Sequence, residues 1–445
     1  MRLPKPPPTS DALSLLERLA VLAAHLAEVN VKSGTYLPFD ELRHRTRPDS
    51  VSENAWWFAH KAARSIAATT IPLPIPGANP TLVRTDTLLE SITYIERTCA
   101  GQLGTPEHAL GATDPQRFVI SALREEAIQS SLLEGAATTR REAQEMLRTQ
   151  RAPRTHGERM VANNYAGIRW IREHQTAAVT PDAIRTLHSV LTEGTLDDAD
   201  VGRVQTPDET RVSVRSWLDD TVLHHPPPAE RIPEQLSQLC AFAMEEQPGP
   251  WLHPVERAIL VHFWFAWLHP FVDGNGRTAR ALFYWVMLKK GFWFTEYVTL
   301  SRRLRKAPAQ YARAFLHTEM DEYDLTYFVL HQLKAFRAAV DDAREYVQRK
   351  ATTLRQAESR LRLAGVLNGR QMALIQHART HTTPEYTIAS HQHSHGVSYP
   401  TARSDLYDLR DKALLRSFKR SRKLVFVPVD ALDDAIAAAV AVAQR

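Results

Sequence analysis

Cysteine is scarce in this chain, and neither copy has the surroundings of a disulfide framework or a zinc site. Cys99 and Cys240 lie far apart among 445 residues, and neither belongs to a CxxC pair or to a histidine cluster at zinc-ligand spacing. A chain of this length can bury more than one hydrophobic core, so it needs no disulfide for stability. We therefore expect two free thiols in a reducing compartment.

Long hydrophobic runs are also missing. The longest apolar stretch, residues 258–268, is too short to span a bilayer and contains His262. The first ten residues, MRLPKPPPTS, lack the apolar segment of a signal peptide. These two features predict a cytoplasmic protein without a membrane partner.

Charge of one sign is not strongly enriched. The net charge is +5, and the fractions of hydrophobic (44%) and charged (24%) residues are those of an ordinary globular protein. This mildly basic balance permits a nucleotide or nucleic-acid partner without requiring one. The length predicts two or three domains.

Changes in composition and hydrophobic periodicity along the sequence predict three regions, residues 1–113, 114–350 and 360–445. The first begins with a proline-rich lead and otherwise resembles a helical scaffold, to which we assign no function. Apolar periodicity predicts helices over residues 11–28, 82–100, 116–135, 140–148, 160–174, 232–246, 254–268 and from 278 to about 360. Asp114 and Pro115 are suited to start the helix near 116–135. Alternating β-branched residues predict a short strand or hairpin at residues 210–214.

Twelve residues, 269–280, bring together groups suited to nucleotide chemistry. Pro270 disfavours the α conformation at His269, so the preceding apolar helix should end there and leave the histidine facing a loop. Residues 273–276 form a glycine-rich turn that leads into a new helix. The free N–H groups at such a helix start bind phosphate oxygens.

Each charged group of this stretch has a chemical use. Arg277 and Arg280 lie at the positive end of a helix dipole, which is unfavourable unless an anion sits between them. Asp273 offers a hard oxygen ligand for Mg²⁺, and His269 can take a proton from a hydroxyl group. A helix cap and an ordinary loop would explain the parts separately but not their combination.

The stretch HPFVDGNGRTAR resembles the Fic motif, HxFx(D/E)GNGRxxR, at every specified position. The preceding HPVERAILVHFWFAWL is similar to the family's central helix, and the resemblance covers roughly residues 115–330. It implies a mainly α protein with a Fic-type helical core and a β-hairpin flap, with an N-terminal helical region and a C-terminal winged helix-turn-helix domain. Fic proteins bind ATP with Mg²⁺ through this motif, transfer AMP to a target hydroxyl and release pyrophosphate.

The resemblance implies a role for each motif residue. His269 would be the general base, Asp273 would hold the metal, and Phe271 would pack into the core and fix the loop. The phosphates would be bound by the turn and both arginines, namely Gly274, Asn275, Gly276, Arg277 and Arg280. Tyr311, in AQYARAF, falls where the family often places a tyrosine near the nucleotide.

An upstream segment, SSLLEG at residues 130–135, resembles the family's inhibitory motif, (S/T)xxxE(G/N). By this resemblance Glu134 would pair with Arg280 and displace the γ-phosphate, with Ser130 one helical turn earlier. A carboxylate satisfies exposed arginines when nucleotide is absent. Helix capping alone is the competing explanation of so short a pattern.

Residues 202–214 resemble the family's flap, a hairpin that holds the target protein by strand addition. The resemblance places Asp208, Glu209 and Thr210 near its tip. An ordinary surface hairpin is the alternative.

The C-terminal region has the element order of a winged helix. Residues 371–380 and 400–410 are predicted helices, and residues 416–428 are predicted to form two strands joined by a basic turn. We predict duplex DNA contacts from its basic residues, Arg403, Lys419, Arg420, Arg422 and Lys423. Asp405 and Asp408 weaken this basic face, so a protein-interaction or dimerisation module is the alternative.

Three alternating histidines, His391, His393 and His395, raise the question of a zinc site. No cysteine or acidic ligand accompanies them. We therefore predict a polar loop there.

The motif and the inhibitory segment together predict a protein adenylyltransferase, autoinhibited by Glu134. It would use ATP and Mg²⁺ to modify a Ser, Thr or Tyr hydroxyl of a target protein. The alternatives are removal of AMP by the same site, another nucleotide donor, and a DNA-binding transcriptional regulator with a Fic sensor core. Fic proteins of this layout are often dimers, so we predict a homodimer.

Overall fold

A computed structural model describes residues 3–9, 13–49, 51–100, 115–216, 219–363, 367–381, 384–420 and 423–443. The chain is mainly α-helical, as predicted. It divides into two compact units, residues 1–101 with 122–341 and residues 102–121 with 342–445. The three-region division proposed from sequence stays a prediction. None of the described helices combines the length and the apolar character needed to cross a bilayer.

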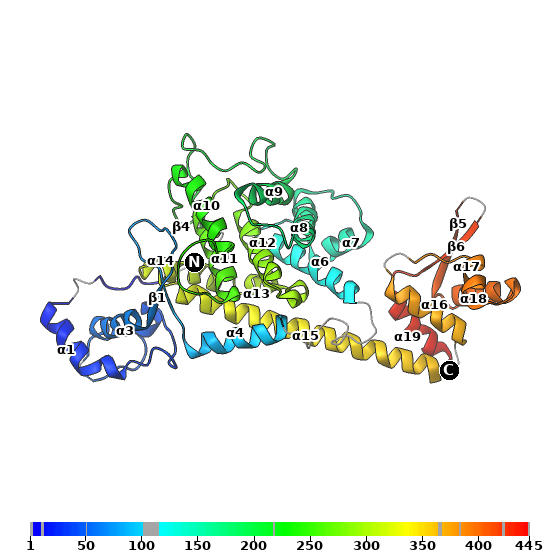
Figure 1. Ribbon diagram of the computed structural model, residues 1–445, viewed down its shortest axis with the longest axis horizontal. Coiled ribbons are helices and arrows are strands. Elements are labelled where there is room, and N and C mark those ends of the chain that lie inside the picture. The colour runs from blue at the N-terminus through cyan, green and yellow to red at the C-terminus, as the bar shows by residue number, and fades with distance from the viewer. Residues whose placement is uncertain are drawn as a thin grey trace. The chain divides into compact units, whose positions relative to one another are not determined.

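Two adjacent helices form the centre of the larger unit (Figure 1). α11 (Pro254–Leu268) is buried on nearly every side, and α12 (Asn275–Lys289) packs along it. Pro254 occupies the first turn of α11, and the N–H of the N-cap residue His253 donates to the Glu256 carboxylate at 2.9 Å. The residues between the two helices, 269–274, are therefore held at both ends by rigid elements.

Most of the helices predicted around this pair are confirmed. They are α6 (Pro115–Leu133), α7 (Arg140–Thr149), α8 (His156–Glu173) and α10 (Ile232–Ala243); Asp114 lies outside the described residues. The stretch predicted as helical from 278 to about 360 is several elements, namely α12, η5 (Trp293–Tyr297), α13 (Leu300–Lys306), α14 (Pro308–Met320) and α15 (Thr326–Leu363). The first break comes at Gly291, whose φ of 83° ends α12.

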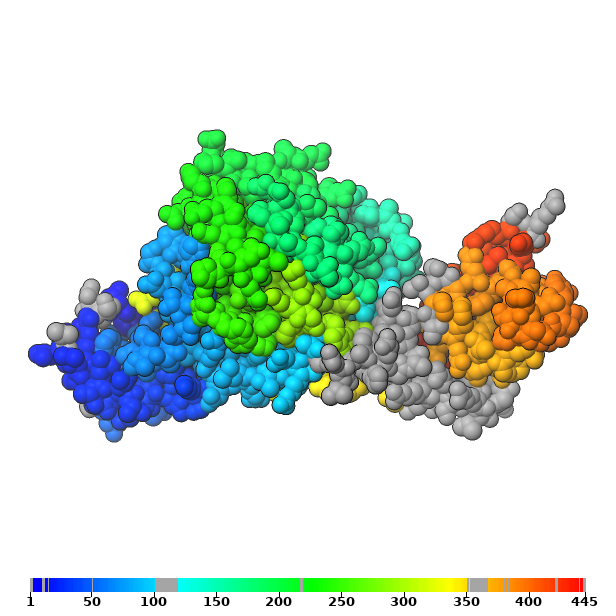
Figure 2. All heavy atoms as spheres, in the orientation of Figure 1, coloured from blue at the N-terminus to red at the C-terminus, as the bar shows by residue number. Residues whose placement is uncertain are grey.

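The N-terminal residues pack onto the central helices. They form α1 (Leu15–His25), η2 (Leu26–Glu28), α2 (Phe39–Leu42), α3 (Glu53–Ala67), β1 (Ala68–Thr70), β2 (Thr81–Val83) and α4 (Asp86–Cys99). The helix predicted from residue 82 starts later, because residues 81–83 pair with β1 and Thr85 caps α4. Arg84 donates to the Glu256 carboxylate at 2.8 and 2.9 Å. Figure 2 shows these residues, in blue, forming one continuous surface with the green central segment.

The hairpin near the centre of the larger unit starts later than predicted. It consists of β3 (Val214–Arg215) and β4 (Val222–His224), so the strand predicted at residues 210–214 is wrong except at Val214. The residues before the hairpin, 205–211, instead contact the end of α11. The N–H of Gln205 donates to the carbonyl of Pro270 at 2.9 Å.

The smaller unit contains the C-terminal elements and their own core. They are α16 (Gly369–Thr380), α17 (Ile388–His395), α18 (Tyr399–Asp411), β5 (Leu415–Arg420), β6 (Lys423–Pro428) and α19 (Leu432–Ala443). The two predicted helices and the hairpin are confirmed, and Tyr386 adds a bridge to Phe426 of β6. The loop predicted around His391–His395 is wrong, because Thr387 caps a helix there that ends at Gly396 in the left-handed conformation. Membership of the winged-helix class stays a prediction.

Candidate active site

His269 ends α11 in a conformation that a histidine seldom adopts. Its φ and ψ are 49° and 55°, and its N–H donates to the carbonyl of Phe265 at 3.0 Å. Pro270 explains why the right-handed helix stops at this residue, as the sequence predicts. A non-glycine residue in this region costs about 1–3 kcal/mol, so the surrounding structure must hold it.

The loop after His269 is closed by side chains. Phe271 is buried and stacks on His188 at a ring-centroid distance of 3.7 Å. The Asn275 side chain accepts from the N–H of Phe271 at 3.0 Å and donates to its carbonyl at 2.7 Å. Phe271 thus has the predicted packing role, whereas Asn275 uses both amide atoms to shape the loop. The predicted contact of Asn275 with phosphate stays a prediction.

Glu134 and Arg280 meet as predicted. Arg280 donates from Nη1 to Glu134 Oε1 at 2.8 Å, and from Nε and Nη2 to Ser130 Oγ at 3.0 and 2.9 Å. Gly135, with φ of 82°, ends the helical segment that carries both partners. Burial by itself lowers the pKa of Arg280, but Glu134, Tyr311 and Glu126 together outweigh burial and raise this pKa.

The carboxylate of Glu134 lies over the first turn of α12. A Cβ placed on Gly276 would come within 2.2 Å of Glu134 Oε1, so only glycine allows this approach. The start of α12 offers unpaired N–H groups and the positive end of the helix dipole. The carboxylate therefore occupies an anion site made by Gly276 and Arg280.

Arg277 lies beside this anion site rather than in it. Its guanidinium is 1% exposed and donates to the carbonyl of Leu191 at 2.8 Å and to Asp273 Oδ2 at 3.3 Å. Asp273 keeps 60% of its side chain exposed. Arg277 thus orients Asp273, and its predicted contact with phosphate stays a prediction.

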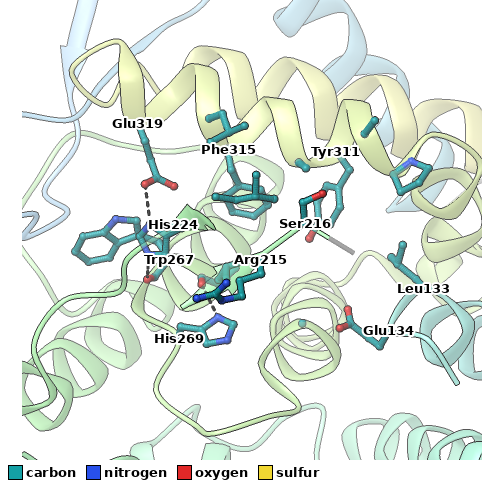
Figure 3. A pocket seen from close by; sticks show the side chains of 18 of the residues that line it. Leu133, Glu134, Arg215, Ser216, His224, Trp267, His269, Tyr311, Phe315 and Glu319 are labelled. Carbon is teal, nitrogen blue, oxygen red and sulfur yellow. Dashed lines mark hydrogen bonds and ion pairs between the residues drawn. The ribbon is translucent and has the colours of Figure 1, made fainter. Parts of the chain in front are cut away.

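A cavity of about 260 Å³ opens next to these residues. Glu134 and His269 lie along one edge, opposite Tyr311 and Phe315 of α14 (Figure 3). The wall on the α14 side is largely apolar. Tyr311 Oη lies 2.8 Å from Nε2 of the buried His262, and burial raises the Tyr311 pKa, so its phenol stays protonated.

The electrostatics of the cavity keep His269 neutral. Burial lowers its pKa to about 4, a contact with the Ala266 carbonyl opposes this, and the nearby His224 and Arg211 lower it further. Nδ1 of His269 lies 3.3 Å from the Ala266 carbonyl oxygen. A neutral ring that donates from Nδ1 has its lone pair on Nε2, so His269 can act as a base.

The residues predicted at the flap tip lie away from the cavity. Glu209 sits in a turn, paired with Arg203 at 2.6 Å, and Asp208 and Thr210 are exposed. Val214, Arg215, Leu223 and His224 line the cavity instead. The sequence shows no spacing pattern that would identify this hairpin face.

The comparisons agree with this geometry. Residues 178–287 match the model of the Fic/DOC family. A protein adenylyltransferase Fic of Nematostella vectensis is 39% identical over 69 residues, 16% of each chain. The protein adenylyltransferase fic-1 of Caenorhabditis elegans is 32% identical over 121 residues, 27% of this chain and 21% of the relative. This chain therefore spans only about a fifth of these relatives.

A solved structure also resembles this chain in fold. A Fic family protein from Desulfovibrio desulfuricans G20 has a TM-score of 0.50 and 21% identity, covering 79% of this chain and 98% of that one. At this identity the match concerns the fold. The motif residues lie within the matched segment, and residues 178–287 belong to the Fic/DOC family.

Proposed function

We propose that this chain is a protein adenylyltransferase that moves AMP from ATP to a Ser, Thr or Tyr hydroxyl of a target protein. One observation carries the proposal: a neutral histidine, His269, shares a cavity with an anion site that Gly276 and Arg280 form. The apolar wall on the α14 side, which includes Ala309, Ala312 and Phe315, suits a purine base. The names of the relatives agree with this activity.

The reaction follows from the chemistry of these groups. Nε2 of His269 takes the proton of the target hydroxyl, and the freed oxygen attacks the α-phosphorus of ATP. The new O–P bond forms as the bond to pyrophosphate breaks, and pyrophosphate leaves. Arg280 and the start of α12 stabilise the departing phosphates once Glu134 has moved aside.

Asp273 is suited to hold Mg²⁺. Its carboxylate is 60% exposed and is oriented by Arg277. Among the described residues, we find no cluster of three or more histidine, cysteine or acidic side chains that could hold a metal ion. Mg²⁺ would therefore take most of its oxygen ligands from water and ATP, and it would neutralise phosphate charge.

Mass spectrometry tests the proposal and separates its alternatives. The Glu134→Gly protein is incubated with Mg²⁺ and a mixture of nucleoside triphosphates. We expect an AMP adduct on a hydroxyl side chain, absent in the Glu134→Gly, His269→Ala double variant. No adduct with any nucleotide argues against the transferase. A different adduct identifies another donor, and removal of AMP by the wild-type chain supports the reverse activity.

The pH dependence of transfer should reflect the lowered pKa of His269. A base whose pKa is about 4 stays neutral above that value, so kcat/KM should hold down to about pH 5 and halve near pH 4. Steady-state rates of Glu134→Gly across this range check the prediction, with circular dichroism to confirm that the protein stays folded. A midpoint near pH 6.5, the ordinary histidine value, would contradict it.

A second candidate function, binding of duplex DNA, rests on the smaller unit. Asp405 does not weaken the basic face, since it is buried and accepts from Arg370 at 2.7 Å and from Asn368 at 2.8 Å. Of the predicted contact residues, Arg403, Lys419, Arg420 and Lys423 are exposed, and Arg422 lies outside the described residues. Arg420 pairs with Glu385 at 2.7 Å, so its guanidinium is less available to bind a DNA phosphate.

We expect affinity for duplex DNA to fall linearly on a log–log plot against salt concentration. Lys423→Ala should reduce this slope by about 1, because it removes one phosphate contact. Fluorescence anisotropy at several salt concentrations measures both quantities. Binding without a salt slope, or no binding, argues for a protein-interaction module. The predicted homodimer is tested separately by analytical ultracentrifugation.

A further inference from the structure

The carbonyl groups at the end of α11 are bound by the segment that leads into the β3–β4 hairpin. The last carbonyls of a helix have no partner inside it. Arg211 donates from Nη2 to the carbonyl of Leu268 at 2.8 Å and from Nη1 to that of His269 at 3.2 Å. His224 Nε2 lies 2.7 Å from the carbonyl oxygen of Trp267. Three consecutive carbonyls, ending at the proposed base, are thus held by two side chains.

His224 has an acceptor at each ring nitrogen (Figure 3). Its Nδ1 lies 2.7 Å from Glu319 Oε2, and its Nε2 faces the Trp267 carbonyl. A carbonyl oxygen carries no proton, so Nε2 must donate. Imidazole is a stronger base than carboxylate, so the proton shared with Glu319 belongs on Nδ1. Both nitrogens can donate at once only if the ring is an imidazolium, held between α14 and α11.

We propose that Arg211 and His224 are positioning residues that hold His269 in its left-handed conformation, and that His224 does so only as an imidazolium. Loss of one proton leaves either Glu319 or the Trp267 carbonyl without a donor. The hairpin then loosens from the end of α11, and His269 loses part of the support for its unusual backbone. This inference rests on the proposed AMP transfer. It predicts that kcat/KM falls at alkaline pH, which gives the pH profile an alkaline limb.

Three other titratable or charged groups near this contact keep one charge state around neutral pH. His269 stays neutral, because burial lowers its pKa to about 4. Arg211 stays charged, although burial lowers its pKa, and burial raises the pKa of Tyr323, which follows α14. A change of charge within this contact therefore falls on His224.

The decisive variant is Glu319→Gln in the Glu134→Gly protein. Glutamine keeps the size and an acceptor oxygen but removes the charge that stabilises the imidazolium. We expect the alkaline limb of kcat/KM to move to lower pH. His224→Gln should give a low rate without this limb. Glu322→Gln changes an exposed carboxylate outside this contact (85% exposed) and should keep the parent profile. A Glu319→Gln profile that overlays the parent overturns the proposal.

A second readout separates this inference from the AMP-transfer proposal. NMR of the full chain with labelled histidine follows the His224 ring, assigned by its loss in His224→Gln. We expect its titration to move to lower pH in Glu319→Gln, and amide exchange in residues 205–216 to speed up above its midpoint. If both occur but no variant transfers AMP, the transferase proposal fails and the contact stands. A His224 titration unaffected by Glu319→Gln overturns the contact itself.

Discussion

Replacing His269 by alanine should lower AMP transfer by about 10²–10⁴-fold while leaving ATP affinity within about threefold. The imidazole supplies the lone pair that takes the hydroxyl proton, and burial keeps that lone pair available by lowering the His269 pKa to about 4. The anion site at Gly276 and Arg280 does not include His269. Transfer rates and ATP dissociation constants in the Glu134→Gly background measure the two effects separately.

A matched control uses another histidine. His44→Ala removes an exposed imidazole on the N-terminal part of the chain and should leave the rate of transfer unchanged. Alanine changes the backbone strain at position 269 only slightly. The unfolding temperature of the His269→Ala protein should therefore be close to that of its parent. Equal transfer by His269→Ala and its parent would show that another group is the base.

The motif could be predicted from sequence because its chemistry is local. Residues 269–280 are contiguous, and prolines mark both ends of α11, Pro254 at its start and Pro270 just past its end. Burial of α11 followed from its apolar composition. The contact between Glu134 and Arg280 joins residues 146 positions apart, and it was predicted through family resemblance rather than periodicity.

The contacts around His269 could not be predicted in the same way. His224 and Glu319 are separated by 95 residues, and Arg211 and Leu268 by 57. No spacing rule links such positions, since their meeting depends on how α14 and the hairpin pack against α11. The same packing places residues 205–211 against α11. The strand that alternation predicts at residues 210–214 therefore starts only at Val214.

Some helices outside the predicted set also carry local sequence signals of helix. α17 was predicted as a loop because histidines are polar, yet Thr387 and Ser390 form a capping box and Gly396 ends the helix. α9 (Pro181–Thr192) starts with Thr180 as N-cap and Pro181 at the first position, a recognisable helix start. The apolar α19 and the amphipathic α3 were not predicted either, although their composition favours helix.

Glu134→Gly is expected to raise ATP affinity and AMP transfer by about 10–100-fold while lowering the free energy of unfolding. The bond from Arg280 to Glu134 is charge-assisted, and such bonds contribute about 1.5–3 kcal/mol, which nucleotide phosphates must overcome. Without Glu134, the buried Arg280 keeps its hydrogen bonds to the neutral Ser130 and loses its directly bonded carboxylate. Since Glu134 is 32% exposed, the loss of stability should be about 1–2 kcal/mol, less than for a fully buried pair.

The opposite signs of these two effects distinguish inhibition from helix capping. A residue that only ends a helix would lower stability when replaced and would leave ATP affinity unchanged. Glu145→Gly provides the comparison, because this exposed carboxylate of α7 pairs with Arg148 and not with Arg280. It should cost about 1 kcal/mol of stability through helix propensity and give no gain in transfer. If Glu134→Gly behaves like Glu145→Gly in both urea unfolding and ATP binding, capping explains Glu134 and the resting site is open.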